Sequence, residues 1–144
     1  MIETTWHTSA TPAEVWKVLG DGWLYAGWVV GASRIRDVDA SWPAEGSKIH
    51  HSVGSWPLLL NDVTVVESSV PGSLLVLTAK TRPLGEARVE IELECGAGTT
   101  IRMREDLIRG PGRAIPSAVR QLSLVPRNRE SLRRLTYLAE GRSR

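Results

Sequence analysis

The sequence of 144 residues lacks the features that mark several large classes of protein. Its single cysteine, Cys95, excludes an internal disulfide framework and cannot form a thiolate metal site by itself. No apolar run approaches the ~18 residues that a membrane-spanning helix requires. The N-terminus has neither the basic nor the apolar region of a secretory signal peptide. We therefore expect a cytoplasmic protein without a membrane span.

Catalytic and cofactor-binding motifs are also absent. The three histidines, His7, His50 and His51, do not have the spacing of a metal site, so we expect no metal and no cofactor. The sequence contains no Gly-x-Ser-x-Gly elbow and no Gly-rich phosphate loop. Nucleophilic acyl chemistry and nucleotide binding through such a loop therefore have no support.

Charge is unevenly distributed along the chain. Residues 1–101 carry 7 Lys and Arg against 12 Asp and Glu, whereas residues 102–144 carry 11 Arg against 4 acidic residues. A basic C-terminal segment suits phosphates or acidic lipid headgroups, but a solvated helix face whose arginines pair with the acidic outer faces of the strands is the preferred explanation. Because no nucleic-acid-reading module accompanies the arginines, we expect no nucleic-acid partner.

The pattern of apolar residues predicts one domain, residues 1–144, of the α+β class. Residues 86–94 alternate strictly between apolar and charged side chains, which is typical of an antiparallel strand with one buried face. Similar alternation or turn-bounded apolar runs predict seven strands at 4–8, 33–38, 48–53, 59–67, 73–80, 86–94 and 100–107.

Two helical regions flank this series of strands. Thr11, Pro12 and Glu14 form a helix-start signal after the first strand, and the apolar segment 23–30 predicts a second short helix or a turn. At the C-terminus, apolar residues recur at helical spacing over 128–140. Leu122 and Val125 fit an earlier turn of the same stripe, so Pro126 either kinks one long helix or starts a shorter one.

Glu105 is the most informative candidate for a functional site. It falls on the inward face of its strand with Ile101, Met103 and Leu107. A carboxylate that points into a core needs a partner, a cavity or water. It is therefore a candidate general acid or base, unless it reaches solvent at the strand end or pairs with an arginine of the C-terminal helix.

Two further polar residues are predicted to face inward. His51 shares a strand face with Ile49 and Val53 and could polarise a ligand carbonyl or move a proton, or simply bond to the backbone. Asn128 faces inward if the helical stripe extends back by one turn, and it would otherwise cap the helix.

The order of elements, with 11-Thr-Pro-Ala-Glu-Val-Trp-16 after the first strand and Gly110-Pro111 after the last, resembles the START-like superfamily of polyketide cyclase/dehydrase and lipid-transport proteins (SRPBCC). Residues 28–31, 42–46, 51–57 and 129–135 resemble an actinobacterial branch. The resemblance implies a helix-grip fold, in which a curved seven-stranded antiparallel sheet surrounds a long C-terminal helix and leaves an apolar cavity.

The resemblance also implies where a ligand would bind. Trp28, Trp42 and Trp56 correspond to loops that rim the cavity in that family, and Met103 lies on the inward face of its strand. Arg82 and the helix residue Arg129 could neutralise an enolate or a carboxylate. Each of these residues has an ordinary alternative role, as a packed core side chain or as a solvated arginine.

Two functions follow as hypotheses. The first is a binding protein for a small apolar or aromatic molecule such as a lipid or a polyketide. The second is an enzyme of the polyketide cyclase, aromatase or dehydratase type, in which Glu105 or His51 transfers the proton. A homodimer formed through the sheet edges is left open.

Overall fold

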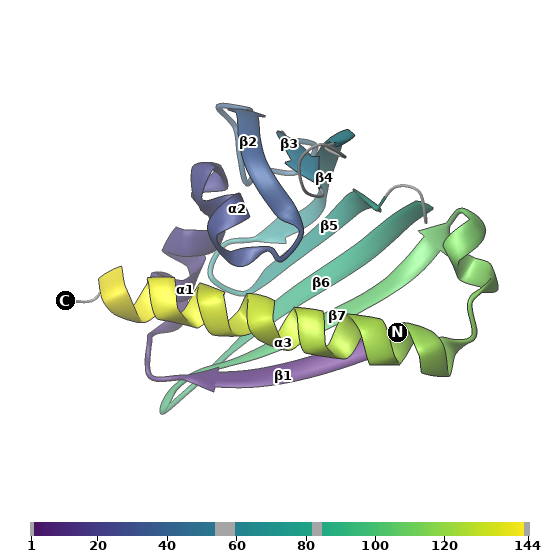
Figure 1. Cartoon of the computed structure of the whole chain (residues 1–144). Helices are drawn as coiled ribbons and strands as arrows, with labels where there is room; N and C mark the ends of the chain where they lie inside the picture. The colour runs from purple at the N-terminus through teal and green to yellow at the C-terminus, as the bar shows by residue number, and fades with distance from the viewer. Residues whose placement is uncertain (1, 54–59, 82–84, 143–144) are drawn as a thin grey trace.

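The computed structural model describes residues 2–53, 60–81 and 85–142 of the chain. Its strands form one antiparallel sheet in the order β1-β7-β6-β5-β4-β3-β2, and the sheet curves around a long helix (Figure 1). The predicted α+β helix-grip fold is therefore confirmed. The strands are β1 (Ile2–Thr8), β2 (Ala32–Val38), β3 (Lys48–Val53), β4 (Leu60–Val70), β5 (Leu74–Thr81), β6 (Gly85–Gly96) and β7 (Gly98–Arg109).

The long β6–β7 hairpin fixes which side chains face the helix. On β7, Ile101, Met103, Glu105 and Leu107 are buried and alternate with partly exposed residues, as the period-two pattern predicts. The register pairs Val89 with Glu105 and Ile91 with Met103, so the inner face of the sheet is continuous across the two strands. The predicted inward position of Glu105 is confirmed.

Bulges and one tight glycine shape the sheet. Pairing shifts register within β2–β3, within β4–β5 and near Glu86 in β6–β7, and such shifts bend strands. At the β6–β7 turn, Gly98 has φ +92°, and a Cβ there would lie 2.1 Å from the carbonyl oxygen of Thr8. Only glycine fits this position, where the end of β1 lies against the β6–β7 turn.

Two short helices follow β1. In α1 (Pro12–Leu19), the Thr11 side chain accepts from the Glu14 backbone N–H, and the Glu14 carboxylate accepts from the Thr11 N–H. This capping box, with proline at the first helical position, confirms the helix-start signal. A 3₁₀ turn, η1 (Gly22–Leu24), then leads into α2 (Tyr25–Trp28).

The C-terminal helix α3 (Ser117–Arg142) follows a 3₁₀ turn, η2 (Pro111–Ala114), and lies across the inner face of the sheet (Figure 1). It continues through Pro126, so this proline neither starts the helix nor caps it. The expectation that Leu122 belongs to the buried stripe is wrong, because its side chain is 78% exposed. The inward positions of this half are Leu124 and Arg127 instead, which continue the spacing of the buried residues that follow.

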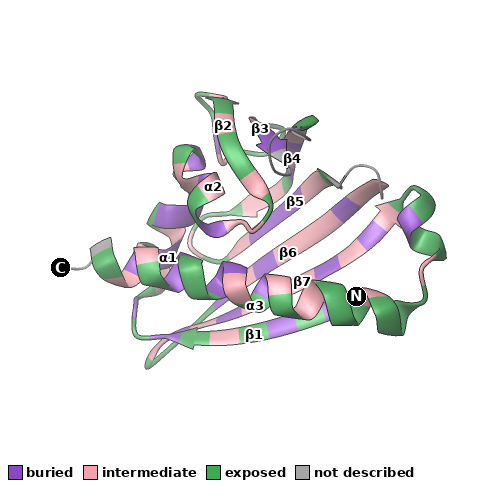
Figure 2. Cartoon of the chain, in the orientation of Figure 1, coloured by how far each residue is buried: buried purple, intermediate pink, exposed green. Residues whose placement is uncertain are grey.

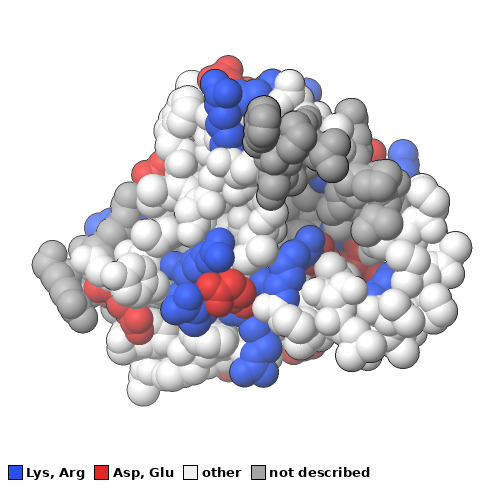
Figure 3. Space-filling view, viewed as in Figure 1, with Lys and Arg blue, Asp and Glu red and all other residues white. Residues whose placement is uncertain are grey.

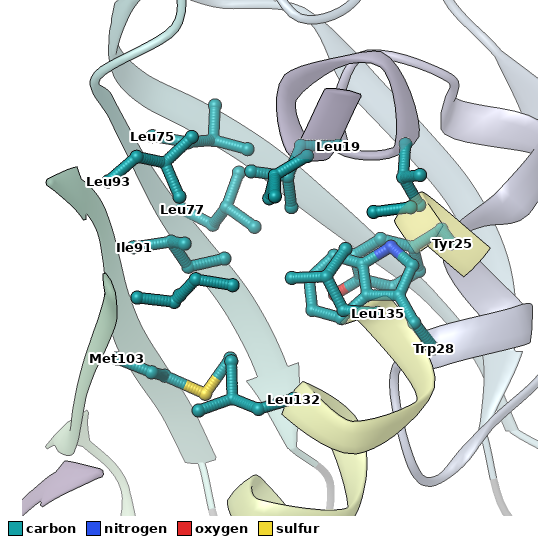
Figure 4. Close-up of a cluster of buried hydrophobic side chains, with 14 of the residues drawn as sticks. Leu19, Tyr25, Trp28, Leu75, Leu77, Ile91, Leu93, Met103, Leu132 and Leu135 are labelled. Atoms are coloured by element: carbon teal, nitrogen blue, oxygen red, sulfur yellow. The ribbon is translucent and has the colours of Figure 1, made fainter. Parts of the chain in front are cut away.

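The core lies between α1, α2, the sheet and the C-terminal half of α3. Leu132 and Leu135 extend from α3 toward Ile91 and Met103 of the sheet, beside Tyr25 and Trp28 (Figure 4). Figure 2 shows that burial is concentrated in this half of α3, whereas its first turns are exposed. Within the described residues, no helix is both long and apolar enough to cross a bilayer.

Several arginines of the basic C-terminal segment lie on the outer face of the sheet. Arg102 pairs with Glu92 and Glu94, and Arg104 pairs with Glu3. On the outer side of α3, Arg133 and Arg134 share Glu130. The charge asymmetry of the sequence is thus partly compensated by pairing on the surface.

Candidate functional site

A buried ion pair joins the sheet to α3. Nη2 of Arg127 lies 2.7 and 2.5 Å from the two carboxylate oxygens of Glu105. The Glu105 side chain is only 4% exposed, whereas that of Arg127 is 33% exposed. A carboxylate removed from water is costly unless it is paired, so Arg127 is what allows Glu105 to face inward.

A cavity of about 100 Å³ lies beside this ion pair. Its walls come from the end of β7, the segment after η2 and the N-terminal half of α3: Glu105, Leu107, Ile115, Val119, Arg120, Ser123, Leu124 and Arg127. Figure 3 shows the surface hollowed between α3 and the sheet, with acidic atoms in the hollow and basic atoms at its edge. The cavity is thus mainly apolar with charged groups at defined points.

The second arginine of the cavity wall is also paired. Nη1 of Arg120 lies 2.5 Å from Oδ1 of Asp106, the residue that follows Glu105 on β7. Glu105 and Asp106 are adjacent on β7, so the two ion pairs hold the same half of α3 to the same strand. Both pairs link residues whose positions in the sequence are well separated.

A second polar group occupies the opposite part of the inner face. Nε2 of His51 lies 2.8 Å from Oγ1 of Thr64, and the same hydroxyl lies 3.1 Å from the phenolic oxygen of Tyr25. The rings of Tyr25 and His51 have centroids 5.4 Å apart. His51 comes from β3, Thr64 from β4 and Tyr25 from α2, so three elements converge on one hydroxyl.

Burial controls the ionisation of this group. It lowers the pKa of the His51 imidazole from its ordinary value of 6.5, while the Asp62 carboxylate and the Ser52 backbone oppose the change. The imidazole is therefore neutral near pH 7. Burial also raises the pKa of Tyr25 to about 12. The Thr64 hydrogen bond and the charge of Arg127 lower this pKa, and the charge of Glu105 raises it, each by less than burial does. The ion pair and the Tyr25 phenol are thus within electrostatic range of each other.

Asn128 is buried in the interior of α3, one residue beyond Arg127, and not at a helix cap. Its Nδ2 has no hydrogen-bond partner among the described residues. Nδ1 of His51 is likewise buried without a partner at hydrogen-bonding geometry. Native proteins leave few buried polar atoms unpaired, so the amide of Asn128 has spare capacity for a bound molecule or a water.

Trp28, Trp42 and Met103 lie in the core. The Trp28 ring packs edge-on against Tyr25, with centroids 5.6 Å apart. Nε1 of Trp42 donates to the backbone oxygen of Leu19 at 3.1 Å, which ties the loop before β3 to α1. Met103 is buried beneath Leu132 (Figure 4). The structure gives each of these residues a packing role.

The remaining predicted residues are not part of the described site. Arg129 is exposed on α3, next to the buried Asn128. Trp56 and Arg82 lie outside the described residues. Among the described residues, no cluster of three or more His, Cys, Asp or Glu side chains could hold a metal ion.

Three contributors to the site were not identified from the sequence. Thr64 shares the inner face of β4 with Asp62 and Val66, and this period-two pattern could have predicted its inward position. Tyr25 has no such signal, because α2 is too short for a recognisable stripe. The sequence allows an arginine of the C-terminal helix as a partner for Glu105, but only the packing of α3 on β7 selects Arg127.

Comparison with known proteins gives the fold but no close relative. No protein-family model and no curated protein matches the chain. Solved structures match over nearly its whole length. A protein of unknown function from Staphylococcus aureus is similar at 15% identity and a TM-score of 0.73, covering 99% of this chain and 94% of that one.

Two other matches carry more specific names. Ara h 8.0201 is similar at 13% identity and a TM-score of 0.73, covering 96% of both chains. StfQ, a di-domain ARO/CYC protein from the steffimycin biosynthetic pathway, is similar at 12% identity and a TM-score of 0.74, covering 98% of this chain and 50% of that one. At these identities the likeness concerns the fold, and the actinobacterial branch stays a prediction. The chain thus has the START-like helix-grip fold, as its resemblance to that superfamily predicts.

Proposed function

We propose that this protein binds a small apolar or aromatic molecule, such as a lipid or a polyketide, between the inner face of the sheet and α3 in the cytoplasm. The observation that carries the proposal is the buried amide of Asn128, whose Nδ2 has no partner among the described residues. It lies one helical turn beyond Leu124, which lines the cavity. A ligand oxygen at this position would satisfy the amide.

The size and lining of the cavity support such a ligand. Drug-sized ligands occupy pockets of roughly 300–1,000 Å³, and the described cavity of about 100 Å³ suits one ring or the end of a longer chain. Leu107, Ile115 and Leu124 supply apolar contacts, and Glu105 and Arg127 contribute paired charges to the lining. The fold that this chain shares with Ara h 8.0201 and StfQ supports the general class of ligand-binding protein, and it does not identify the ligand.

Two substitutions on the same helix test the proposal. Leu124→Trp should fill the cavity and weaken binding of the neutral fluorescent probe N-phenylnaphthylamine by about tenfold or more, because the indole would occupy the space that the phenyl ring of the probe would enter. Leu122→Trp, two residues away and 78% exposed, is the matched control and should bind like the wild type. Native mass spectrometry of the purified wild type would identify any co-purified ligand. Equal probe binding by both variants and the wild type would contradict the proposed position.

A second function is favoured by the neutral His51. A buried neutral imidazole can accept a proton, and its contact with Thr64 links it to the Tyr25 phenol. In a cyclase, aromatase or dehydratase, His51 or Glu105 would move the proton of an enolisable substrate. StfQ and BexL are ARO/CYC proteins, and each is about twice as long as this chain.

The enzyme hypothesis has its own test. His51→Gln and Glu105→Gln should each lower turnover of a poly-keto substrate by about a hundredfold or more if the residue transfers the proton. Turnover that is unchanged in both variants would refute this assignment. Binding of the fluorescent probe, measured in parallel, separates a loss of chemistry from a loss of the cavity.

A further inference from the structure

The charges around the cavity indicate which kind of ligand it accepts. The ionised groups of its described wall are Glu105, Arg120 and Arg127. Each arginine has an acidic partner, Arg127 with Glu105 and Arg120 with Asp106. The wall therefore offers no described cation without a counter-charge to an incoming anion.

Within the part of the chain that the structure describes, the interior holds no fully buried cation. Among the described residues, the buried charged side chains are those of Asp62 and Glu105, and no lysine or arginine is buried to the same degree. The guanidinium of Arg36 meets this region from the edge of the sheet and donates to the backbone oxygens of His51 and Asp62. A carboxylate that entered the cavity would lose its hydration and would meet no described cation that lacks a counter-charge, which is unfavourable.

Hydrogen-bonding capacity next to the cavity favours an acceptor on the ligand. Asn128 is not part of the described lining, but it follows Arg127 on α3 and lies one turn beyond Leu124, and both of those residues line the cavity. Nδ2 of Asn128 can only donate, and it is buried without a partner among the described residues. A ketone, an ester or a phenol oxygen would satisfy it without bringing a charge. The balanced ion pairs and the unsatisfied amide thus point to the same chemistry.

We propose that the ligand is uncharged and presents a carbonyl or hydroxyl oxygen to Asn128, and that the Glu105–Arg127 ion pair excludes carboxylates from the cavity. This inference rests on the proposed binding function and narrows it to neutral, oxygen-bearing molecules. It gives Glu105 a role in specificity: by pairing with Arg127 it removes a cation that would otherwise attract acids such as free fatty acids.

The test uses two probes of nearly equal shape, acetylnaphthalene and naphthoate substituted at the same ring position. The carbonyl carbon carries a methyl group in the first probe and a charged oxygen in the second. In the wild type the ketone should bind about tenfold more tightly than the carboxylate. Glu105→Gln leaves Arg127 without its counter-charge and should improve naphthoate binding by about tenfold. The double variant Glu105→Gln/Arg127→Gln removes both charges and leaves no unpaired cation, so it should lack the gain in naphthoate binding that Glu105→Gln shows.

Glu92→Gln is the matched control, because Glu92 lies on the outer face of the sheet in an ion pair with Arg102. It should bind both probes as the wild type does. Equal or tighter binding of naphthoate by the wild type would overturn the inference and leave the proposed binding function standing. Binding of neither probe to the wild type, up to about 1 mM, would count against the binding function itself, and the inference would fall with it. The wild-type comparison decides the matter even if Glu105→Gln does not fold.

Discussion

The two halves of α3 contact the same sheet in different ways. From Asn128 to Ala139 the helix is buried at regular helical spacing and closes the core against α1, α2 and the sheet. From Ser117 to Arg127 no side chain is fully buried, and the contact with β7 consists of a cavity and two ion pairs. One half therefore stabilises the fold, and the other leaves room for a ligand.

The difference follows from the residues on the inward face. In the C-terminal half these are Leu132, Leu135 and Ala139, which are completely buried. In the N-terminal half they are Leu124 and Arg127, and an arginine cannot fill a core. A single helix thus combines a fully packed segment with a segment that lies over a cavity.

Truncation of one leucine in each half gives the largest expected contrast. Leu135→Ala should lower the free energy of unfolding by about 2–5 kcal/mol, because it opens a cavity in the packed core. Leu124→Ala should cost less than about 1 kcal/mol, because it enlarges a cavity that already exists. Urea unfolding followed by tryptophan fluorescence measures both. Equal losses at the two positions would show that the halves do not differ in packing.

Removal of Arg127 should have the next largest effect. Arg127→Met leaves the Glu105 carboxylate buried without its partner and should lower the free energy of unfolding by about 2 kcal/mol, since Arg127 is itself partly exposed. Arg133→Met, at an exposed ion pair on the outer side of the same helix, is the control and should change stability less. Thermal unfolding of the two variants gives the comparison. A loss in Arg133→Met as large as in Arg127→Met would contradict the importance of burial.

The pH dependence of stability should show a smaller effect from the polar group opposite the ion pair. Because the pKa of His51 is lower in the folded than in the unfolded chain, the unfolded chain binds the proton more tightly. The contribution of His51 is fully present above pH 6.5 and is lost as the pH falls below that value toward its folded pKa. Unfolding measured at several pH values should show a smaller loss on acidification in His51→Gln.

His7→Gln is the control for this measurement, because His7 is exposed on β1. It should keep the loss of stability seen in the wild type on acidification. An identical pH dependence in wild type and His51→Gln would show that burial does not lower the pKa of His51 in the folded chain.

Much of the site's location, but not its composition, could be predicted from the sequence. The alternation of β7 places Glu105 inward, and that of β3 does the same for His51, because successive side chains of a strand point to opposite faces. Their partners could not be predicted in the same way. Arg127 and Thr64 are selected by contacts between elements, and the strand register and helix position that create those contacts are not encoded in a local pattern.

The sequence by itself determined the elements and the fold class. Seven alternating segments, the Thr11 capping box and the apolar spacing of residues 128–140 each follow from local rules of periodicity and capping. Only the tertiary structure decided that α3 begins at Ser117 and that its first half lies over a cavity with Arg127 on Glu105. The physical reason is that periodicity reports which face of an element is apolar, whereas the partner of a buried charge and the space left beside it depend on how two distant elements pack.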